Sequence, residues 1–457
     1  MKPQSRPRPE AASLDRPRDA PPDAAADDGL TQDLRDAWPF AWYSHPRPVF
    51  LGGNEVRLLR GGQDLFPAVC EAIAKARHEV WFATYIFHDD PAASAVAETL
   101  CRAARRGVRV RVVIDGFGSW STLPRLLPLL REAGVGAVVF RPIRGWWSWL
   151  QPGQLRRLHQ KLCVVDGEVA FVGGINVIDD LLDIRHGWSD LPRLDYAVEL
   201  RGPVVHPIEH TVRALWTRAC FGRDWRDELA VLARSPHPVA RAKRFFRRLR
   251  ATRWAGLEGA VLDGRPVRAA FVVRDNFRQR RTIERSYIDA IRRAQRRVDV
   301  VSPYFYPGRA FRQALVAAAR RGVQVRLLLQ GKLDYRIAGV AARALYDELL
   351  VHGVRIFEYM PAFLHAKVAV VDDDWATVGS SNIDPLSLLV NLEANVIVRD
   401  PGFVRRLADE LEQAFAASRE VTQPDLGLPR WWSRARRGIV AWCAYVYLRV
   451  AGATGRY

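Results

Sequence analysis

Two stretches of the chain repeat one alternation of apolar runs and helical patterns. Runs of strand length, rich in valine and isoleucine, alternate with segments in which apolar residues recur every three or four positions. This alternation predicts α/β units around buried, largely parallel sheets. The first stretch predicts helices over 66–76 and 93–106 and strands over 80–87 and 108–114; the second predicts helices over 283–294 and 310–321 and strands over 298–306 and 323–329.

An exact internal repeat ties the two stretches together. The hexapeptide Ala-Ala-Arg-Arg-Gly-Val occupies 103–108 and recurs letter for letter at 318–323, between the same kinds of element. A repeat of this length in the same context indicates duplication of a whole unit. We therefore expect two tandem α/β domains, over 39–219 and 266–420, related by a pseudo-twofold.

Three segments lie outside the duplicated units. Residues 1–38 are rich in Pro, Asp, Ala and Arg without an apolar period, which predicts a disordered tail. Segment 220–265 mixes Arg with aromatic residues, so it fits either a solvated charged linker or an anion-binding surface. Segment 421–457 carries a Trp pair, Arg residues and a short apolar run, which fits an interfacial helix or a helix docked on the protein's own core.

The charge of the chain and its cysteine and apolar content indicate which partners and which compartment it suits. Lys and Arg number 69 against 50 Asp and Glu, a formal net charge of +19, and such a surface attracts polyanions or an anionic membrane face. Five widely spaced cysteines without a CxxC pair, and no apolar leader, favour a reduced cytosolic compartment. No stretch reaches 18 apolar residues, so no ordinary spanning helix is expected.

The chemistry lies in a duplicated motif. The first copy has His159, Lys161 and Asp166, followed by Gly-Gly-Ile-Asn ending at Asn176; the second has His365, Lys367 and Asp372, followed by Gly-Ser-Ser-Asn with Ser380 and Asn382. The chain has only six lysines, and two of them occupy this matching position. Coincidence is a poor explanation for two such matches.

The spacing predicts how these groups meet. His and Lys two positions apart on a strand project from the same face. Two copies meeting at a pseudo-twofold interface then surround one small volume with two imidazoles, two ammonium groups and two Asn amides. Such a site suits a phosphodiester: Lys and Asn hold the non-bridging oxygens, one His attacks phosphorus, and the other protonates the leaving alkoxide. No metal or other cofactor is required. The motif aspartates Asp166 and Asp372 are either catalytic or braces of the strand turn.

These paired motifs resemble those of the phospholipase D superfamily, over about residues 54–420. The resemblance implies two α/β halves with the active site at their interface and a phospho-histidine intermediate. It also implies a carboxylate downstream of each motif that orients a catalytic His, matched here by Glu393 and, less closely, by Asp195. The first-copy His would be the nucleophile and the second the acid. A glycine at 174 replaces the serine common at this place in the superfamily, so one hydroxyl is missing from the first half.

Within the superfamily the chain resembles the bacterial cardiolipin synthases, in particular the B-type without N-terminal spanning helices. The resemblance implies transfer of a phosphatidyl group to phosphatidylglycerol at the cytoplasmic face of the membrane, by a peripheral protein that contacts anionic phospholipids. The Trp-rich stretch 146–150 before the first motif favours a lipid substrate or else forms a buried aromatic cluster. Three functions stay open: this transferase, a phospholipase- or nuclease-type phosphodiesterase of the same superfamily, and a non-catalytic scaffold. The sequence leaves the oligomeric state undetermined, and nucleic acid is the less favoured partner.

Overall fold

The fold is taken from a computed structural model, which describes residues 47–143, 156–184, 186–221, 267–275, 279–332, 345–384 and 391–422. These residues all belong to one compact unit. The segment 144–155, which includes the Trp-rich stretch, lies outside the described residues, as do 1–46, most of 220–265 and 423–457. The predictions made for these segments, and the domain boundaries drawn from them, therefore stay predictions.

The elements follow the same order twice. In the first half they are β1 (Leu51–Arg60), α3 (Gly61–Lys75), β2 (Glu79–Thr84), α4 (Pro91–Arg105), β3 (Arg109–Asp115), α5 (Leu123–Glu132), β4 (Gly136–Phe140), β5 (Leu162–Val165), β6 (Val169–Gly173), β7 (Leu182–Asp183), β8 (Gly187–Trp188), β9 (Tyr196–Arg201) and α6 (Val205–Phe221). In the second they are β10 (Val267–Arg274), α9 (Thr282–Arg293), β11 (Arg297–Ser302), α10 (Arg309–Arg320), β12 (Gln324–Gln330), α12 (Tyr346–Leu350), β13 (Arg355–Tyr359), β14 (Val368–Val371), β15 (Trp375–Gly379), β16 (Glu393–Arg399), α14 (Pro401–Ala416) and β17 (Ser418–Glu420).

Fifteen strands form one hydrogen-bonded series that reads alike from its centre outward. The order is β17-β13-β12-β11-β14-β15-β16-β10-β1-β9-β6-β5-β2-β3-β4, and β1 pairs with β10 at the centre. A register shift between Leu51 and Asn54 interrupts β1, whose first residues pair with β10 and whose remainder pairs with β9. The predicted α/β fold of two similar halves is confirmed.

The expectation of largely parallel sheets is wrong. Only β2-β3, β3-β4, β11-β12 and β12-β13 are parallel, while the other pairs in the series are antiparallel. The reason is that β5-β6 and β14-β15 are tight hairpins, which force antiparallel pairing. The unbroken apolar runs indicated strands that are buried on both faces of the sheet, but such runs do not show whether neighbouring strands are parallel or antiparallel.

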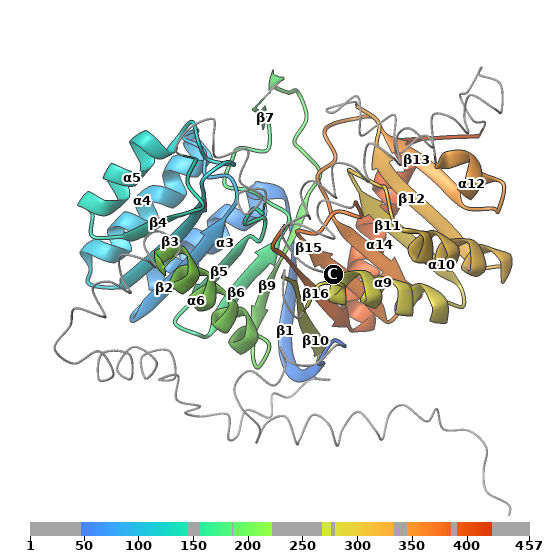
Figure 1. Cartoon of the computed structure of the whole chain (residues 1–457), viewed down its shortest axis with the longest axis horizontal. Coiled ribbons are helices and arrows are strands. Elements are labelled where there is room, and N and C mark those ends of the chain that lie inside the picture. Colours follow the sequence, from blue (N-terminus) through green and yellow to red (C-terminus); the bar gives the residue numbers. More distant parts are fainter. Residues whose placement is uncertain are drawn as a thin grey trace, which may run out of the picture. The chain divides into compact units, whose positions relative to one another are not determined.

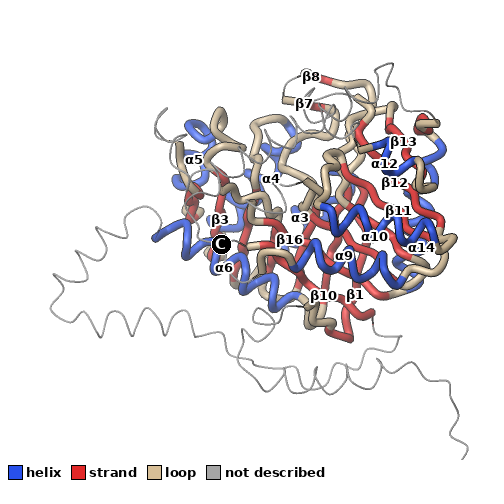
Figure 2. Tube along the Cα trace, turned by 45° about the vertical axis from the view of Figure 1, so that its right-hand side comes forward, coloured by secondary structure: helices blue, strands red, loops and turns tan. Residues whose placement is uncertain are grey.

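Helices cover both faces of each half (Figure 1). In the first half α3, α4 and α5 share a core with one face of the strands, and in the second α9, α10 and α12 do so. The opposite faces, with α6 and α14, contribute to a single core that spans both halves, including Val164, Val198, Val370 and Val396. In the view of Figure 2 the β7-β8 hairpin projects above the body of the molecule.

The repeated hexapeptide is explained residue by residue. Ala103 and Ala318 are fully buried, and the glycines at 107 and 322 end α4 and α10 with φ of 90° and 87°, which glycine adopts without strain. The guanidinium of Arg106 donates to the carbonyls of Ile73 and Ala74 at the end of α3, and Arg321 repeats this at the end of α9. The hexapeptide therefore ends one helix and caps the one before it.

Candidate active site

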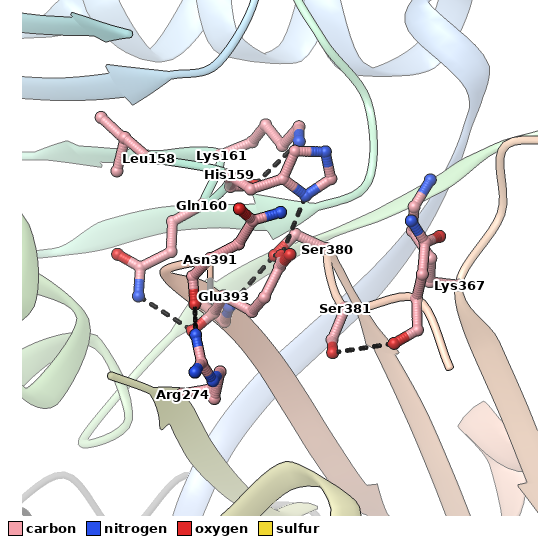
Figure 3. A network of polar contacts seen from close by, with 12 residues as sticks. Leu158, His159, Gln160, Lys161, Arg274, Lys367, Ser380, Ser381, Asn391 and Glu393 are labelled. Carbon is pink, nitrogen blue, oxygen red and sulfur yellow. Dashed lines mark hydrogen bonds and ion pairs between the residues drawn. The ribbon is translucent and has the colours of Figure 1, made fainter. Parts of the chain in front are cut away.

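The two His-Lys segments lie at the contact between the halves, each hydrogen-bonded to the other half's backbone. The backbone N–H of His159 donates to the carbonyl of Leu392 at 3.0 Å, and the backbone N–H of His365 donates to the carbonyl of Leu194 at 2.9 Å. Isolated bridges join Leu158 to Leu392 and Leu194 to Leu364. Each motif thus lies next to the segment that enters β16 or β9 of the opposite half, and Figure 3 shows the first motif beside Asn391 and Glu393.

Side chains cross between the halves in the same way. Nδ1 of His159 lies 2.9 Å from Oε2 of Glu393, and Nδ1 of His365 lies 2.6 Å from Oδ2 of Asp195. Both carboxylates are almost completely buried. A carboxylate at Nδ1 holds the proton on that nitrogen and leaves Nε2 with a free lone pair in the neutral ring. Each half therefore supplies one imidazole and orients the other half's imidazole.

Glu393 has a hydroxyl partner, which no hydrogen bond among the described residues gives to Asp195. The Ser380 hydroxyl donates to Oε2 of Glu393 at 2.6 Å and accepts the N–H of Ala394 at 3.0 Å. Burial tends to raise the pKa of Glu393, but the neighbouring His159, Lys161 and Ser380 outweigh it and lower that pKa. Burial raises the pKa of Asp195 to about 6, so its carboxylate is still ionised at pH 7. Both His partners are therefore anionic at neutral pH.

The missing hydroxyl of the first half has a steric cause. A Cβ at Gly174 would collide with the carboxylate of Asp195, whose Oδ1 accepts the N–H of Tyr196 at 2.8 Å. Aspartate is one methylene shorter than glutamate, so its carboxylate lies close to the backbone that carries it and fills the place of a serine side chain. The two halves thus hold a carboxylate in the same role by different means.

Both histidines are neutral in this setting. Burial lowers the pKa of His159, although Glu393 opposes the effect. Burial and the positive charges of Lys367 and Arg193 hold the pKa of His365 well below its ordinary value of 6.5. Their side chains retain 11% and 24% exposure, so both rings are shielded yet reachable. A neutral imidazole with a free Nε2 is the form that attacks phosphorus.

Both lysines precede their strands and turn back on the backbone. Nζ of Lys161 donates to the carbonyl of His159 at 2.8 Å, and Lys367 donates to that of His365. Since β5 begins at residue 162 and β14 at 368, the prediction that the His-Lys pairs lie on strands is wrong by a few residues. Burial lowers the pKa of Lys161 to about 7 and that of Lys367 to about 8, against the attraction of Glu393 and Asp195.

The two asparagines are buried but differ in their contacts. Oδ1 of Asn176 accepts the N–H of Ile86 at 3.4 Å. Oδ1 of Asn382 is buried and has no hydrogen-bond partner among the described residues. A half-turn about χ2 would place the NH₂ group at that position. A contact of Asn382 with a substrate phosphate therefore stays a prediction.

The motif aspartates do not join this group. Asp166 accepts the backbone N–H groups of Arg77, His78 and Glu79 at 2.7–2.8 Å, and Asp372 accepts those of residues 295–297. Each lies five residues after its Lys, on the other side of a four-residue strand, and so about 16 Å from that Lys along the strand. These contacts favour the second of the two interpretations, in which Asp166 and Asp372 brace the hairpin turns, where both have φ near 50°.

Three further residues position the site and were not found from the sequence. Oδ2 of Asp115, at the end of β3, accepts the N–H of Leu158 at 2.9 Å, and Oε1 of Gln330, at the end of β12, accepts the N–H of Leu364 at 2.9 Å. Each holds the residue before a motif His. The signal was a polar residue at the end of a buried strand, at matching places in both halves.

Tyr85 is the third, and it breaks the symmetry. Its ring lies edge-on to the His159 ring, with centroids 5.0 Å apart, and Nζ of Lys161 lies 5.4 Å from its centroid. The matching position in the second half is Pro303, because Thr84 and Ser302 both donate to the carbonyl two residues on. The position in the second half that matches Tyr85 therefore carries no aromatic ring. As for metals, the described residues hold no group of three or more His, Cys, Asp or Glu side chains arranged as ligands.

Comparison with known proteins agrees with this geometry. The fold and the paired site are those of a phospholipase D-like protein of two halves. The family model described as "Cardiolipin synthase, PLD-like domain" matches residues 69–185 and 287–417, and the chain belongs to this family. The expected membership of the phospholipase D superfamily, and of its cardiolipin synthase type, is confirmed.

Curated relatives cover most of the chain. It is 37% identical over 383 residues to cardiolipin synthase B of Shigella flexneri, which spans 83% of this chain and 85% of that protein. It is 34% identical over 375 residues to cardiolipin synthase A of Pseudomonas putida strain GB-1, spanning 82% and 71%. The crystal structure of phosphatidylserine synthase from Haemophilus influenzae Rd KW20 has a TM-score of 0.60 at 13% identity, over 91% of this chain and 97% of that one, and shows the same fold.

Proposed function

We propose that this protein is a phosphatidyltransferase that makes cardiolipin from phosphatidylglycerol and a second phospholipid. The family and the names of its relatives support the class of reaction. The observation that carries the mechanism is the crossed pairing of His159 with Glu393 and of His365 with Asp195. It supports two neutral imidazoles, each with its Nε2 free for chemistry.

The first half-reaction forms a phospho-histidine. Nε2 of His159 attacks phosphorus, and the bond from phosphorus to the leaving alcohol oxygen breaks. His365, protonated on substrate binding, gives its proton to that alkoxide, so a neutral alcohol departs. The anionic phosphate offsets the surrounding positive charge and favours protonation of His365 in the complex.

The second half-reaction reverses these roles. Nε2 of His365 removes the proton of the acceptor hydroxyl as that oxygen attacks phosphorus, and the phosphorus–nitrogen bond breaks to restore His159. Lys161 and Lys367 offset the charge on the non-bridging oxygens in both steps. Ser380 acts through Glu393, which it touches, rather than on the substrate.

The lipid substrates imply a location. We propose that the protein works at the cytoplasmic face of the membrane as a peripheral protein, in contact with anionic phospholipids. The net charge of +19 supports attraction to such a surface. Within the described residues, no helix has the length and apolar character needed to cross a bilayer.

The test is a mass-spectrometric profile of lipids after incubation of the purified protein with phosphatidylglycerol vesicles, alone or with phosphatidylethanolamine. We expect cardiolipin from the wild type and none from His159→Ala or His365→Ala. The control variant His352→Ala, in the turn between α12 and β13, should retain activity. Phosphatidic acid as the sole product would replace the transferase with a phospholipase-type hydrolase. No lipid turnover, with cleavage of DNA or RNA, would make the protein a nuclease.

The order of the two histidines is tested with a phosphatidyl ester of p-nitrophenol, a leaving group that needs no acid. His365→Ala should then release one equivalent of nitrophenol and gain the mass of a phosphatidyl group. His159→Ala should show neither change. The reverse pattern would exchange the two roles.

A further inference from the structure

Most of the exposed apolar side chains lie in the connections next to the strand ends that hold the site. Eight large apolar residues are exposed among the described residues, and six of them form what we call the apolar rim: Phe117, Trp120, Ile184, Trp188, Leu191 and Met360. The other two lie on α5 and after α12. Exposed apolar residues are ordinary when scattered, but a cluster at one place marks a contact surface.

The rim follows the strand ends that hold the site. Phe117 and Trp120 come directly after β3, whose last residue, Asp115, binds the segment of His159. Met360 comes directly after β13, which pairs in parallel with β12, whose last residue, Gln330, binds the segment of His365. Parallel strands end at one edge of their sheet, so both halves present apolar residues at the edge that holds the site.

The other three rim residues lie on the β7-β8 hairpin or just after it, and the hairpin stands out from this edge in Figure 1. Ile184, Trp188 and Leu191 are 56%, 62% and 50% exposed. A hairpin of two-residue strands that presents a tryptophan and two aliphatic side chains to solvent is costly unless a partner covers them.

The base of this hairpin is fixed although its tip is exposed. Oδ2 of Asp180 accepts the N–H of Gly62 at 2.5 Å on one side of the base. On the other side Leu194 donates to the carbonyl of Phe363 and accepts the N–H of His365, both at 2.9 Å. The next residue is Asp195, which orients His365. The base of the hairpin is therefore tied to the catalytic segment of the opposite half.

We propose that the apolar rim, led by the β7-β8 hairpin, enters the headgroup layer of a phospholipid bilayer and places the site opposite the lipid phosphates. This inference rests on the proposed function, and it adds the surface through which the substrate is reached. Tryptophan and aliphatic side chains at the rim of a positively charged protein suit a layer that is apolar inside and anionic outside. Arg193 at the hairpin base and the exposed Lys332 place positive charge beside the rim.

A triple variant of the full chain, Ile184→Ser/Trp188→Ser/Leu191→Ser, tests the proposal against Val351→Ser, which removes an 80% exposed apolar side chain at the opposite strand edge. Two substrates are compared: phosphatidylglycerol vesicles and dihexanoyl phosphatidylglycerol below its micelle concentration. The triple variant should lose at least tenfold in turnover on vesicles and keep its rate on the monomeric lipid. Val351→Ser should match the wild type on both.

Equal losses on both substrates would overturn the proposal, because the hairpin would then act through His365. Unchanged turnover on both would overturn it as well. Vesicle sedimentation in the His159→Ala background measures membrane binding without chemistry. If that binding depends on the hairpin, it supports the proposed membrane surface. This result would hold even if no lipid turnover were found and the proposed function failed. Analytical ultracentrifugation completes the test: a wild-type dimer that the triple variant dissociates, with vesicle binding unchanged, would assign the rim to a second copy of the chain.

Discussion

Glu393 belongs to the second half of the chain, yet its carboxylate lies 2.9 Å from Nδ1 of His159 in the first. Asp195 of the first half does the same for His365 of the second. Neither half can therefore form a complete histidine site alone. The duplication produced a single site with two linked imidazoles rather than two independent sites.

Glu393→Gln and Asp195→Asn test this crossed arrangement. An amide keeps the shape of the carboxylate but removes the charge that fixes the proton on Nδ1, so each variant should lose ~100-fold or more in kcat. Stability should change less than activity. With the nitrophenyl ester, Glu393→Gln should slow formation of the covalent intermediate and Asp195→Asn should not. Glu199→Gln is the matched control. Glu199 lies on β9, which begins directly after Asp195, but it pairs with the surface residues Arg57 and Arg201, so this variant should retain full activity.

Ser380→Ala and Gly174→Ser should show that the halves are not interchangeable. Ser380→Ala removes two hydrogen bonds and leaves Glu393 less well held, at a cost of about 1–3 kcal/mol in the free energy of unfolding and a lower kcat. Gly174→Ser places a side chain against Asp195 and should lower both stability and kcat. Denaturant unfolding and initial rates measure the two effects. A fully active Gly174→Ser enzyme would contradict the steric account.

The pH profile should report the two lysines. Both must be charged to hold phosphate, and their pKa values are lowered to about 7 and about 8. A lowered pKa means that the proton is lost at lower pH, so kcat/KM should fall as the pH rises through 7–8 instead of near the ordinary value of 10.5. Lys161→Arg should move this limb upward because a guanidinium stays charged. A limb that stays in place in Lys161→Arg and in Lys367→Arg would assign it to another group.

Asp166→Ala should affect stability and spare the chemistry. Asp166 accepts three backbone N–H groups, which together with its partial exposure suggests a loss of about 1–3 kcal/mol. Burial tends to raise the pKa of Asp166, but these hydrogen bonds outweigh it and lower that pKa. The contribution of Asp166 to stability is therefore present above the ordinary value of 3.8 and is lost as the pH falls through the lowered pKa. Unfolding at pH 7 and pH 3 checks the sign. A kcat loss as large as that of His159→Ala would return Asp166 to the active site.

Tyr85→Phe and Tyr85→Ala separate two uses of the ring. The edge contact with His159 and the face toward Lys161 need only the aromatic ring, so Tyr85→Phe should keep most of the activity. Tyr85→Ala should lose about tenfold in kcat/KM because it removes the wall that orients His159. Equal losses in both variants would show that the phenol oxygen, rather than the ring, is what matters.

Much of the site could be predicted from the sequence because the two copies of the duplicated unit can be aligned with each other, which shows which residues match. His159, Lys161, His365 and Lys367 were found as a repeated pattern around rare lysines, and the family resemblance added Asp195 and Glu393. The motif aspartates shared the same spacing, but spacing along a chain does not distinguish the two ends of a short strand. Asp115, Gln330 and Tyr85 lay at strand ends whose neighbours are distant in the chain, so nothing local indicated their contacts with the His segments.

The sequence by itself determined the α/β class, the duplication and the residue types of the chemistry, because apolar periodicity and repeated motifs are local properties of a chain. The tertiary structure decided the strand directions, the exchange of carboxylates between the halves and the position of the apolar rim. Each of these depends on which distant segments pair across the contact between the halves, and that pairing is selected by the packing of the whole core. The same packing determines why Gly174 stands opposite Asp195 while Ser380 supports Glu393.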